Sequence, residues 1–337
     1  MRVLLTGGSG FIAAHVLHTL LERSHTVVTT VRSQDKADRI KAGHLKLGKE
    51  KLDFAIVSDI ALSGAFDLAV QSDPPFDAVI HTASPLVLIV NNVQKEVLDP
   101  AIMGTTGLLA SVRRFAPSVK RVVVLSSFAA MIDLSKGDWP AHTYTAADWN
   151  PITHAEAIVD AIAGYRGSKT FAEKAAWEFM DREKPNFTLT TLNPPFVFGP
   201  VVQYPGLSLD ALNASNRRFV AFLKGMTTPT TFYAWVDVRD MALGHVRAIE
   251  EQSVAGERIF FTSSQQFCNK DILEIIDSEF PELREKLPNR EKWNSVGYPG
   301  DGVYNVDAKR AQELLGREFI PLKECVMDTV KMIKNFL

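Results

Sequence analysis

The sequence has few cysteines and no long apolar run, and both absences narrow its class. Only Cys268 and Cys325 occur among 337 residues, and they lie too far apart for a metal-ligand motif or a disulfide framework. No stretch approaches the roughly 18 to 20 apolar residues of a membrane span. Glycines interrupt the apolar start too early for a signal peptide. We therefore expect a protein of a reducing compartment, cytoplasmic by default, with no membrane partner.

An excess of charge of one sign is also missing. The formal net charge is −2, and no basic stripe or acidic tail stands out, so nucleic acid is a poor candidate partner. Eight histidines are scattered without the spacings of metal-binding motifs, which gives no reason to expect a metal site. Hydrophobic residues make up 46% and charged residues 23% of the chain, as in an ordinary globular protein with a large core.

The chain does contain a repeated alternation of apolar strands and helices. Short continuous apolar runs are typical of parallel strands that are buried on both faces. Strands are predicted at 3–5, 26–31, 54–57, 78–81, 121–125 and 187–192, and helices at 11–23, 102–115 and 165–180. The alternation predicts an α/β fold with a Rossmann-type doubly wound parallel sheet. We expect residues 1–193 to form the dinucleotide-binding domain. Residues 194–337 should form mainly a smaller α/β substrate lobe that partly crosses back.

The first predicted strand runs into a glycine-rich turn. Gly7, Gly10 and Ala13 form a G-x-x-G-x-x-A pattern just before a predicted helix. Small residues are needed there because the chain bends sharply and a pyrophosphate must reach the helix N-terminus. Such a match alone is weak, since many βα turns are rich in glycine, but its place after the first strand favours a dinucleotide site.

The end of the second predicted strand indicates which dinucleotide. Arg32 and Lys36 occur where an acidic residue would bind the 2′-hydroxyl of NAD. Cations at this place suit the 2′-phosphate of NADP. The alternative is that both are solvated cations at the start of a surface loop.

Tyr165 and Lys169 lie four residues apart on a predicted helix, so their side chains share one face. A nearby ammonium favours the phenolate form of tyrosine and eases proton transfer at a carbonyl oxygen. Ser126 and Ser127 follow the strand 121–125, at the edge of a parallel sheet where active sites form. A Y-x-x-x-K pair is common by chance. Combined with the turn and the serines, it favours a nicotinamide-dependent carbonyl reductase.

These motifs resemble those of the extended short-chain dehydrogenase/reductases. Within that family they are similar to the fungal methylglyoxal and aldehyde/ketone reductases, which are related to plant dihydroflavonol and cinnamoyl-CoA reductases. The similar stretches span nearly the whole chain, at 6–13, 31–36, 81–85, 121–127, 165–169, 171–177, 193–200 and 236–240. Ala13 stands where the family usually has glycine, and Pro195 where some relatives have a larger residue.

The resemblance implies a role for each matching residue. Ser127 matches the catalytic serine, Tyr165 the general acid, and Lys169 the residue that lowers the pKa of the tyrosine and binds the nicotinamide ribose. With Arg32 and Lys36, the implied contacts to NADP (NADPH) are Gly7, Gly8, Ser9, Gly10, Phe11, Ile12, Asp59, Ile60, Thr82, Ala83, Ser84, Tyr165, Lys169, Pro194, Val197 and Ser215.

An apolar group that follows these motifs is a candidate substrate wall, and plain core packing is the alternative. It consists of Leu86, Phe128, Met131, Phe196 and Tyr204. His81 and the pair Asp237 and Asp240 around Arg239 are expected to be structural.

We expect an NADPH-dependent reductase of aldehydes and ketones, working as a monomer or a homodimer on a small-molecule carbonyl substrate. Two alternatives stay open. A nucleotide-sugar epimerase or dehydratase shares the fold and the triad, but such enzymes keep tightly bound NAD, and Arg32 argues against it. A non-catalytic NADP-sensing protein would commonly lose the Tyr/Lys pair, which is intact here.

Overall fold

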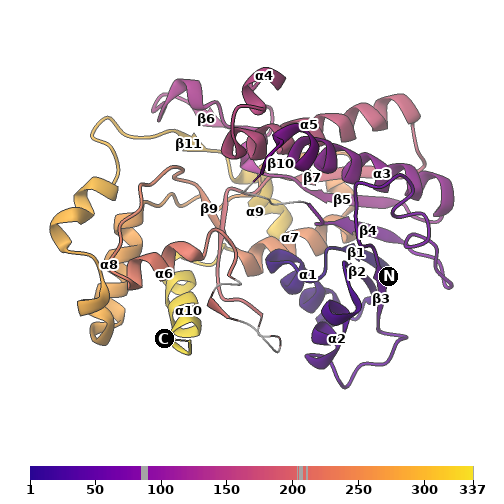
Figure 1. Ribbon diagram of the computed structural model, residues 1–337, viewed down its shortest axis with the longest axis horizontal. Helices are drawn as coiled ribbons and strands as arrows, with labels where there is room; N and C mark the ends of the chain where they lie inside the picture. The colour runs from indigo at the N-terminus through magenta and orange to yellow at the C-terminus, as the bar shows by residue number, and fades with distance from the viewer. Residues whose placement is uncertain (85–89, 203, 205–207, 210–211, 337) are drawn as a thin grey trace.

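One sheet of seven parallel strands forms the centre of the protein in a computed structural model, which describes residues 1–84, 90–202, 204, 208–209 and 212–336 (Figure 1). The strands lie in the order β10-β7-β5-β4-β1-β2-β3. Their bounds are β1 Arg2–Thr6, β2 Thr26–Val31, β3 Leu52–Ile56, β4 Ala78–His81, β5 Arg121–Leu125, β7 Thr188–Leu192 and β10 Arg258–Ile259.

The strand order reverses between β1 and β4, where both strands end at the same edge. In the register of this centre, Leu5 of β1 lies opposite Thr29 of β2 and Ile80 of β4. Ligands of doubly wound sheets bind in the crevice at such a reversal, outside the carboxyl ends of the strands. The predicted fold class is confirmed.

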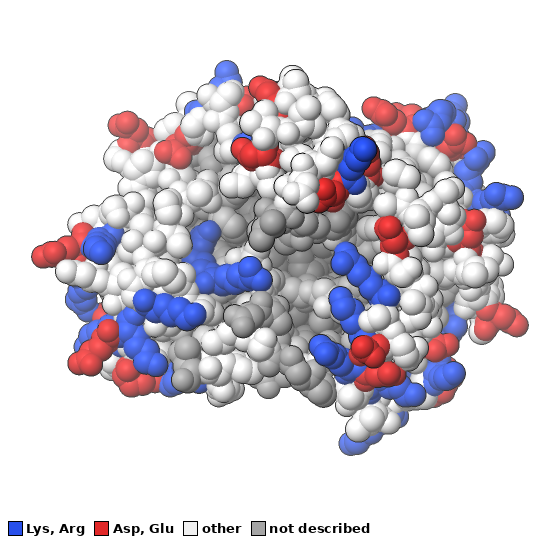
Figure 2. Space-filling view, in the orientation of Figure 1, with Lys and Arg blue, Asp and Glu red and all other residues white. Residues whose placement is uncertain are grey.

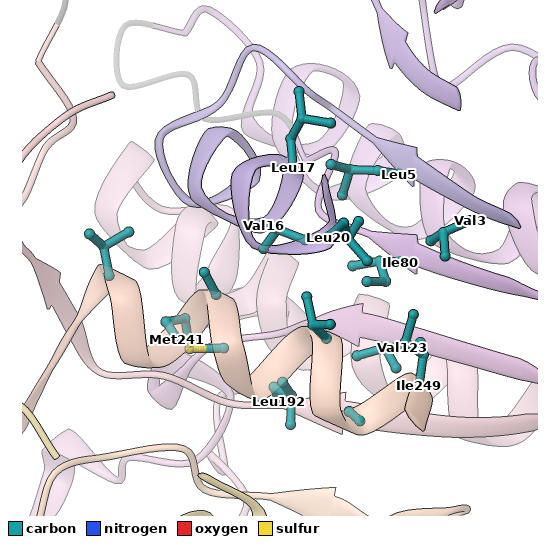
Figure 3. Packing of buried hydrophobic residues seen from close by; sticks show 14 of the residues in the cluster. Val3, Leu5, Val16, Leu17, Leu20, Ile80, Val123, Leu192, Met241 and Ile249 are labelled. Atoms are coloured by element: carbon teal, nitrogen blue, oxygen red, sulfur yellow. The ribbon is translucent and has the colours of Figure 1, made fainter. Parts of the chain in front are cut away.

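Helices cover both faces of the sheet. One face carries α1 (Phe11–Glu22), α2 (Gln34–Ala42), α7 (Val238–Glu250) and α9 (Lys309–Leu315), whose apolar sides enter one cluster with the strands. Figure 3 shows Val16 and Leu20 of α1 and Met241 of α7 directed at strand residues that include Ile80 and Val123. The other face carries α3 (Asp99–Phe115) and α5 (Ala161–Glu183). The N-cap of the long helix α5 is Asp160, whose side chain accepts hydrogen bonds from backbone N–H groups of the first turn.

The C-terminal part of the chain contributes to both lobes. The helix α7 packs along α1, and β10 adds the last strand of the sheet, so the chain returns to the first unit after residue 193. The domain boundary at 193 stays a prediction. A second core joins α6 (Arg217–Leu223), α8 (Asn269–Glu279) and α10 (Leu322–Lys334) into the smaller lobe.

Short elements complete the described chain. Two small parallel sheets pair β6 (Thr143–Tyr144) with β11 (Asn305–Val306) and β8 (Phe196–Phe198) with β9 (Trp235–Asp237). The helix α4 covers His154–Ala157, a π-helical turn covers Gln94–Leu98, and 3₁₀ turns cover Phe128–Ala130, Leu134–Lys136, Gln252–Val254, Pro281–Lys286 and Arg290–Val296.

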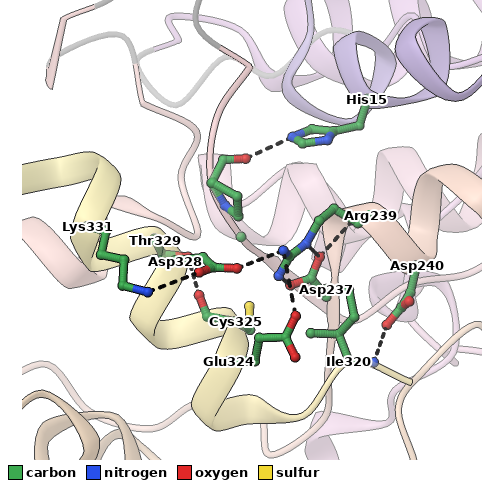
Figure 4. Close-up of polar contacts among 12 residues, drawn as sticks. His15, Asp237, Arg239, Asp240, Ile320, Glu324, Cys325, Asp328, Thr329 and Lys331 are labelled. Carbon is green, nitrogen blue, oxygen red and sulfur yellow. Dashed lines mark hydrogen bonds and ion pairs between the residues drawn. The ribbon is translucent and has the colours of Figure 1, made fainter. Parts of the chain in front are cut away.

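An ion-pair cluster joins α7 to α10, as Figure 4 shows. Arg239 donates from Nε and Nη2 to the buried carboxylate of Asp237, at 2.9 and 2.8 Å, and from Nη1 to Asp328 at 2.7 Å. Asp240 accepts the backbone N–H of Ile320 at 2.8 Å and pairs with Arg317. Burial raises the pKa of Asp240 to about 6. These contacts give both aspartates the structural role that the sequence predicted.

Three further features bear on the class of protein. Cys268 and Cys325 are buried free thiols. In the part of the chain that the structure describes, no three histidine, cysteine or acidic side chains gather in a way that could hold a metal ion. Within the same part, no helix is both long and apolar enough to cross a membrane.

Candidate active site

The glycine-rich turn connects β1 to α1 at the centre of the sheet edge. Gly7 has φ +76°, a left-handed conformation that favours glycine. A Cβ atom at Gly7 would lie only 2.9 Å from Cα of Ala83. The N–H of Gly10 donates to the carbonyl of Gly7 at 2.8 Å, and Gly10 is the N-cap of α1. The turn therefore needs its small residues, and it leaves the N-terminus of α1 open to an anion.

The hydroxyl of Thr6 fixes the loop after β4 beside this turn. Its oxygen accepts the backbone N–H groups of Thr82 and Ala83, each at 3.1 Å. Its own proton is then available to Nδ1 of His81, 2.8 Å away. Burial lowers the pKa of His81 to about 3, so this histidine is neutral and structural. Ser84 follows in the same loop and contacts Lys169 of α5.

The predicted catalytic residues converge from three elements. Ser127 follows β5 and accepts the N–H of Ala129 at 3.1 Å, which fixes its Oγ. Tyr165 lies on α5 and shares a side-chain hydrogen bond with Ser127. Lys169 lies one turn further on, with Nζ 6.0 Å from the centroid of the Tyr165 ring. Its Nζ donates to Oγ of Ser84 at 3.0 Å.

The pKa of Tyr165 departs from the sequence expectation, which was that Lys169 would lower it. Burial raises the pKa of Tyr165 above its usual value, and the hydrogen bond from Ser127 opposes this rise. The ammonium of Lys169 was expected to favour the phenolate. Burial instead lowers the pKa of Lys169 itself to about 8, while the negative charge of Glu173 opposes that fall. A tyrosine that stays protonated suits the donor of a proton rather than a base.

A cavity of about 290 Å³ joins the glycine-rich turn to these residues. Its wall has the features of a dinucleotide site: a glycine-rich turn at one end and a tyrosine–lysine pair at the other. It is lined by Gly10, Phe11, Ile12, Ala13, Thr82, Leu125, Ser126, Ser127, Tyr165, Lys169, Pro194, Pro195, Val197, Asn213, Ala214 and Ser215. Asn213 presents a buried Oδ1 with no partner among the described residues. Nine of the predicted cofactor contacts lie in this wall, and the residues present fit a nicotinamide dinucleotide.

The remaining predicted cofactor contacts lie around this cavity. Gly7 and Gly8 form the start of the turn, and Ser9 is its exposed tip. Asp59 and Ile60 follow β3, where Asp59 accepts the N–H of Ala61 at 2.8 Å and Ile60 packs beside Gly104. Ala83 and Ser84 belong to the loop fixed by Thr6.

Arg32 and Lys36 lie where β2 ends and α2 begins. Arg32 is exposed and Lys36 is partly buried, and neither forms an ion pair with a carboxylate within the described residues. Figure 2 shows lysine and arginine side chains on both sides of the hollow between the lobes. Such cations are available to an anionic group of a cofactor.

A second cavity, of about 250 Å³, adjoins the first at Ser127, Tyr165 and Ser215. Its wall is mainly aromatic and aliphatic and carries no charged side chain among its described residues, which are Ser127, Phe128, Ala129, Ile162, Tyr165, Pro195, Phe196, Ala214, Ser215 and Phe232. The ring of Phe128 stacks on Phe260 at 4.9 Å, and Phe196 lies against Phe232 at 5.4 Å. Ring packing on both sides holds the wall in place.

Two of the predicted wall residues lie elsewhere. Met131 is fully buried in the cluster beneath Phe128, because the 3₁₀ turn 128–130 directs its side chain into the core. The side chain of Tyr204 packs on Gly43, at the end of α2, and its hydroxyl oxygen lies 3.4 Å from Nε2 of His44. Leu86 falls outside the described residues.

Sequence reasoning missed several residues of the two cavities. Ile162 lies three residues before Tyr165 on α5, and this spacing could have identified it. Phe232 and Asn213 come from irregular segments without a motif. Glu173 lies four residues after Lys169, in the stretch 171–177 that resembles the family, but the sequence analysis gave it no role. In the structure it accepts the hydrogen bonds that meet behind the site.

Comparisons with known proteins agree with this geometry. Residues 3–260 match the model of the NAD dependent epimerase/dehydratase family. The chain is 41% identical to the ketoreductase azaE of Aspergillus niger, covering 98% of this chain and 96% of that protein. It is 38% identical to the putative NADPH-dependent methylglyoxal reductase GRP2 of Candida albicans, covering 98% of each.

Solved structures give the same result. The yeast methylglyoxal/isovaleraldehyde reductase Gre2, complexed with NADPH, superposes with a TM-score of 0.90 at 34% identity, over 100% of this chain and 99% of that one. MoeE5, solved with UDP-glucuronic acid and NAD, superposes with a TM-score of 0.70 at 17% identity, over 100% of each chain, and shows a shared fold only. The predicted family is confirmed: the chain belongs to the NAD dependent epimerase/dehydratase family, the extended short-chain dehydrogenase/reductases.

Proposed function

We propose that this protein reduces small, uncharged aldehydes and ketones to alcohols with NADPH. The observation that carries the proposal is the junction of the two cavities at Ser127 and Tyr165. One cavity runs from there to the glycine-rich turn, and the other has an apolar wall. A carbonyl group at the junction meets both hydroxyls, while its apolar substituents lie among Phe128, Phe196 and Ile162. The reductases among the similar proteins support the same chemistry.

The bound cofactor would supply a hydride to the carbonyl carbon. The chain supplies the proton and the environment for the developing alkoxide. Tyr165 donates its phenolic proton to the oxygen, and Ser127 donates a hydrogen bond to the same atom. Lys169 presents a positive charge beside Tyr165 and a donor to the ribose of the cofactor. Arg32 and Lys36 would bind the 2′-phosphate, and the N-terminus of α1 the pyrophosphate.

The apolar wall defines the substrate class. A sugar nucleotide or a coenzyme A ester carries phosphates that require cations converging on the pocket. No lysine or arginine belongs to the described wall of the 250 Å³ cavity. We therefore propose a neutral carbonyl compound with an aliphatic or aromatic flank. Hydrophobic pockets discriminate weakly, by roughly 1 to 3 kcal/mol per methylene, so broad tolerance among aldehydes, diketones and keto esters is expected.

The test is a panel of carbonyl compounds with NADPH and NADH, followed by the loss of the reduced cofactor's absorbance. Turnover of aldehydes and ketones with a preference for NADPH supports the proposal. UDP-glucose and UDP-glucuronic acid with NAD serve as the contrasting substrates. Turnover of the sugar nucleotides without turnover of simple carbonyls would instead assign the epimerase or dehydratase chemistry. Binding of NADPH without any turnover would assign a cofactor-sensing role.

The cytoplasmic location of the protein and its monomeric or homodimeric state stay predictions. Fractionation of cells that carry a tagged copy tests the first, and sedimentation of the purified protein with and without NADPH tests the second.

A further inference from the structure

Glu173 is a buried carboxylate directly behind the catalytic residues. It lies on α5 four residues after Lys169 and eight after Tyr165, on the same side of the helix. Its side chain is almost fully buried, and four different side chains donate to it. Oε2 accepts Ser126 Oγ and Asn193 Nδ2, both at 2.6 Å, and Oε1 accepts Thr191 Oγ1 at 2.9 Å and Arg258 Nε at 2.7 Å.

These four donors come from three neighbouring strands of the sheet. Ser126 follows β5, Thr191 lies in β7, Asn193 follows β7, and Arg258 begins β10. One carboxylate therefore ties α5 to three neighbouring strands, at the carboxyl ends of β5 and β7 and at the start of β10. An isolated buried carboxylate is costly, and the many donors together with the cation of Arg258 compensate for that cost.

Arg258 is itself fixed by contacts with residues 146–149. Its Nη1 donates to the backbone carbonyls of Ala146 and Asp148, and its guanidinium carbon lies 3.7 Å from the centroid of the Trp149 ring. Arg258 is therefore a fixed counter-ion for Glu173.

The partners of Glu173 adjoin the reacting groups. Ser126 precedes Ser127 in the chain. The amide of Asn193 that donates to Glu173 also donates to the backbone carbonyl of Ser127 at 3.3 Å. Asn193 precedes Pro194, whose carbonyl accepts the N–H of Phe128 at 2.8 Å. The position of Ser127 relative to the nicotinamide segment thus depends on contacts that meet at Glu173.

Glu173 also faces Lys169 across a small cavity. The cavity, of about 20 Å³, is lined by both residues together with Ser84, Ser126, His81 and Thr105. The titratable groups around Lys169 are Tyr165 and Glu173 on its own helix and His81 at the end of β4, with Arg258 behind Glu173. His81 is neutral, so Glu173 provides the negative charge that acts on Lys169.

We propose that Glu173, held by Arg258, is a positioning residue for the reaction: it fixes Ser127 through Ser126 and Asn193, and it supplies the negative charge that faces Lys169. The inference rests on the proposed carbonyl reduction. It predicts two separable effects, one of geometry and one of charge.

The experiment compares Glu173→Gln with Glu173→Asp. Glutamine keeps the length but removes the charge, so the pKa of Lys169 should fall below about 8. The alkaline decline of kcat/KM for NADPH should move to lower pH by the same amount. Aspartate keeps the charge but is too short for all four donors. It should restore the pH profile while kcat stays at least tenfold below wild type.

Three additional measurements make the outcome decisive. Asp240→Asn removes another buried, paired carboxylate. It should change kcat by less than about twofold and leave the pH profile where it is. Ser126→Ala removes a single donor, so it tests the geometric effect even if Glu173→Gln fails to fold. It should lower kcat without moving the pH profile. NMR titration of ¹³C-labelled lysines, with Lys169 assigned by its absence in Lys169→Arg, reports the charge contact without any turnover.

The proposal is overturned if Glu173→Gln leaves the Lys169 titration and the pH profile unchanged. It is also overturned if Ser126→Ala keeps full kcat and Glu173→Asp equals wild type. A wild-type protein that reduces no carbonyl would overturn the proposed function alone, because the NMR titration still decides the contact between Glu173 and Lys169.

Discussion

Lys169 donates a hydrogen bond of 3.0 Å from Nζ to Oγ of Ser84, and this contact joins α5 to the loop after β4. Both residues lie beside the cavity assigned to the cofactor, and Lys169 forms part of its wall. The burial that this position imposes lowers the pKa of Lys169 to about 8. The charge of the lysine in the cofactor-free protein is thus sensitive to pH just above neutrality.

We therefore expect kcat/KM for NADPH to fall as pH rises through about 8. In the proposed mechanism the protonated lysine is the form that attracts the cofactor and supports Tyr165, and this form is lost when pH exceeds the pKa of Lys169. This parameter reports the free enzyme. Lys169→Arg keeps a cation at all pH values, so whatever activity it retains should show no such decline. A wild-type profile that stays flat across this range would contradict the assignment.

Tyr165→Phe should leave the binding of NADPH nearly intact and lower kcat by about 10²- to 10⁴-fold, because the ring remains and only the proton donor is removed. Steady-state turnover and fluorescence titration with NADPH measure the two quantities. Tyr204→Phe is the matched control, since Tyr204 packs against α2 and not in the described wall of the substrate cavity. A Tyr165→Phe variant with more than about a third of wild-type kcat would exclude Tyr165 as the acid.

Arg32→Glu should reverse or abolish the preference for NADPH over NADH. A charged hydrogen bond to phosphate is worth roughly 1.5 to 3 kcal/mol, or about 10- to 150-fold in affinity, and the glutamate adds repulsion. The ratio of kcat/KM for the two cofactors is the measurement. Arg39→Glu makes the same charge change at another exposed position near the end of α2 and should leave the ratio within about twofold. Equal effects of both substitutions would indicate a general electrostatic field instead of a specific phosphate contact.

The predicted bounds of helices and strands agree best with the structure where the element is buried on both faces. The strands 26–31, 78–81 and 121–125 were predicted with the bounds that the structure gives, because buried parallel strands are continuous β-branched and apolar runs. The strands β8, β9 and β10 have only two or three residues, too few for a periodic pattern. The return of α7 to the sheet is set by its packing on α1, a contact between segments more than 200 residues apart in sequence that no local pattern reveals.

The same distinction applies to the site. Tyr165, Lys169 and the glycine-rich turn have fixed local spacings, so the sequence predicts them as one group, and the structure places them around one cavity. Glu173 was missed because its donors Ser126, Asn193 and Arg258 are distant in sequence and meet only in the folded sheet. Met131 was misplaced because a 3₁₀ turn, not an extended chain, follows Ser127, and this turn directs the residue into the core.

Phe196→Ala should shift the substrate preference toward bulkier ketones. The Phe196 ring forms one wall of the 250 Å³ cavity, and its truncation enlarges the space beside Ser127 and Tyr165. The measurement is the ranking of kcat/KM across small aldehydes, methyl ketones and aryl ketones, together with the melting temperature, because the ring also packs on Arg218 at 4.3 Å.

Met131→Ala separates a change in the pocket from a change in stability. Met131 is fully buried outside the described wall of the pocket. Its truncation should therefore cost about 2 to 5 kcal/mol of unfolding free energy and leave the substrate ranking as it is. If Phe196→Ala lowered the melting temperature in the same way without altering the ranking, Phe196 would be a core residue and the substrate would lie elsewhere. If Met131→Ala altered the ranking as well, the wall would extend deeper than the described cavity and would include the residue that the sequence first placed in it.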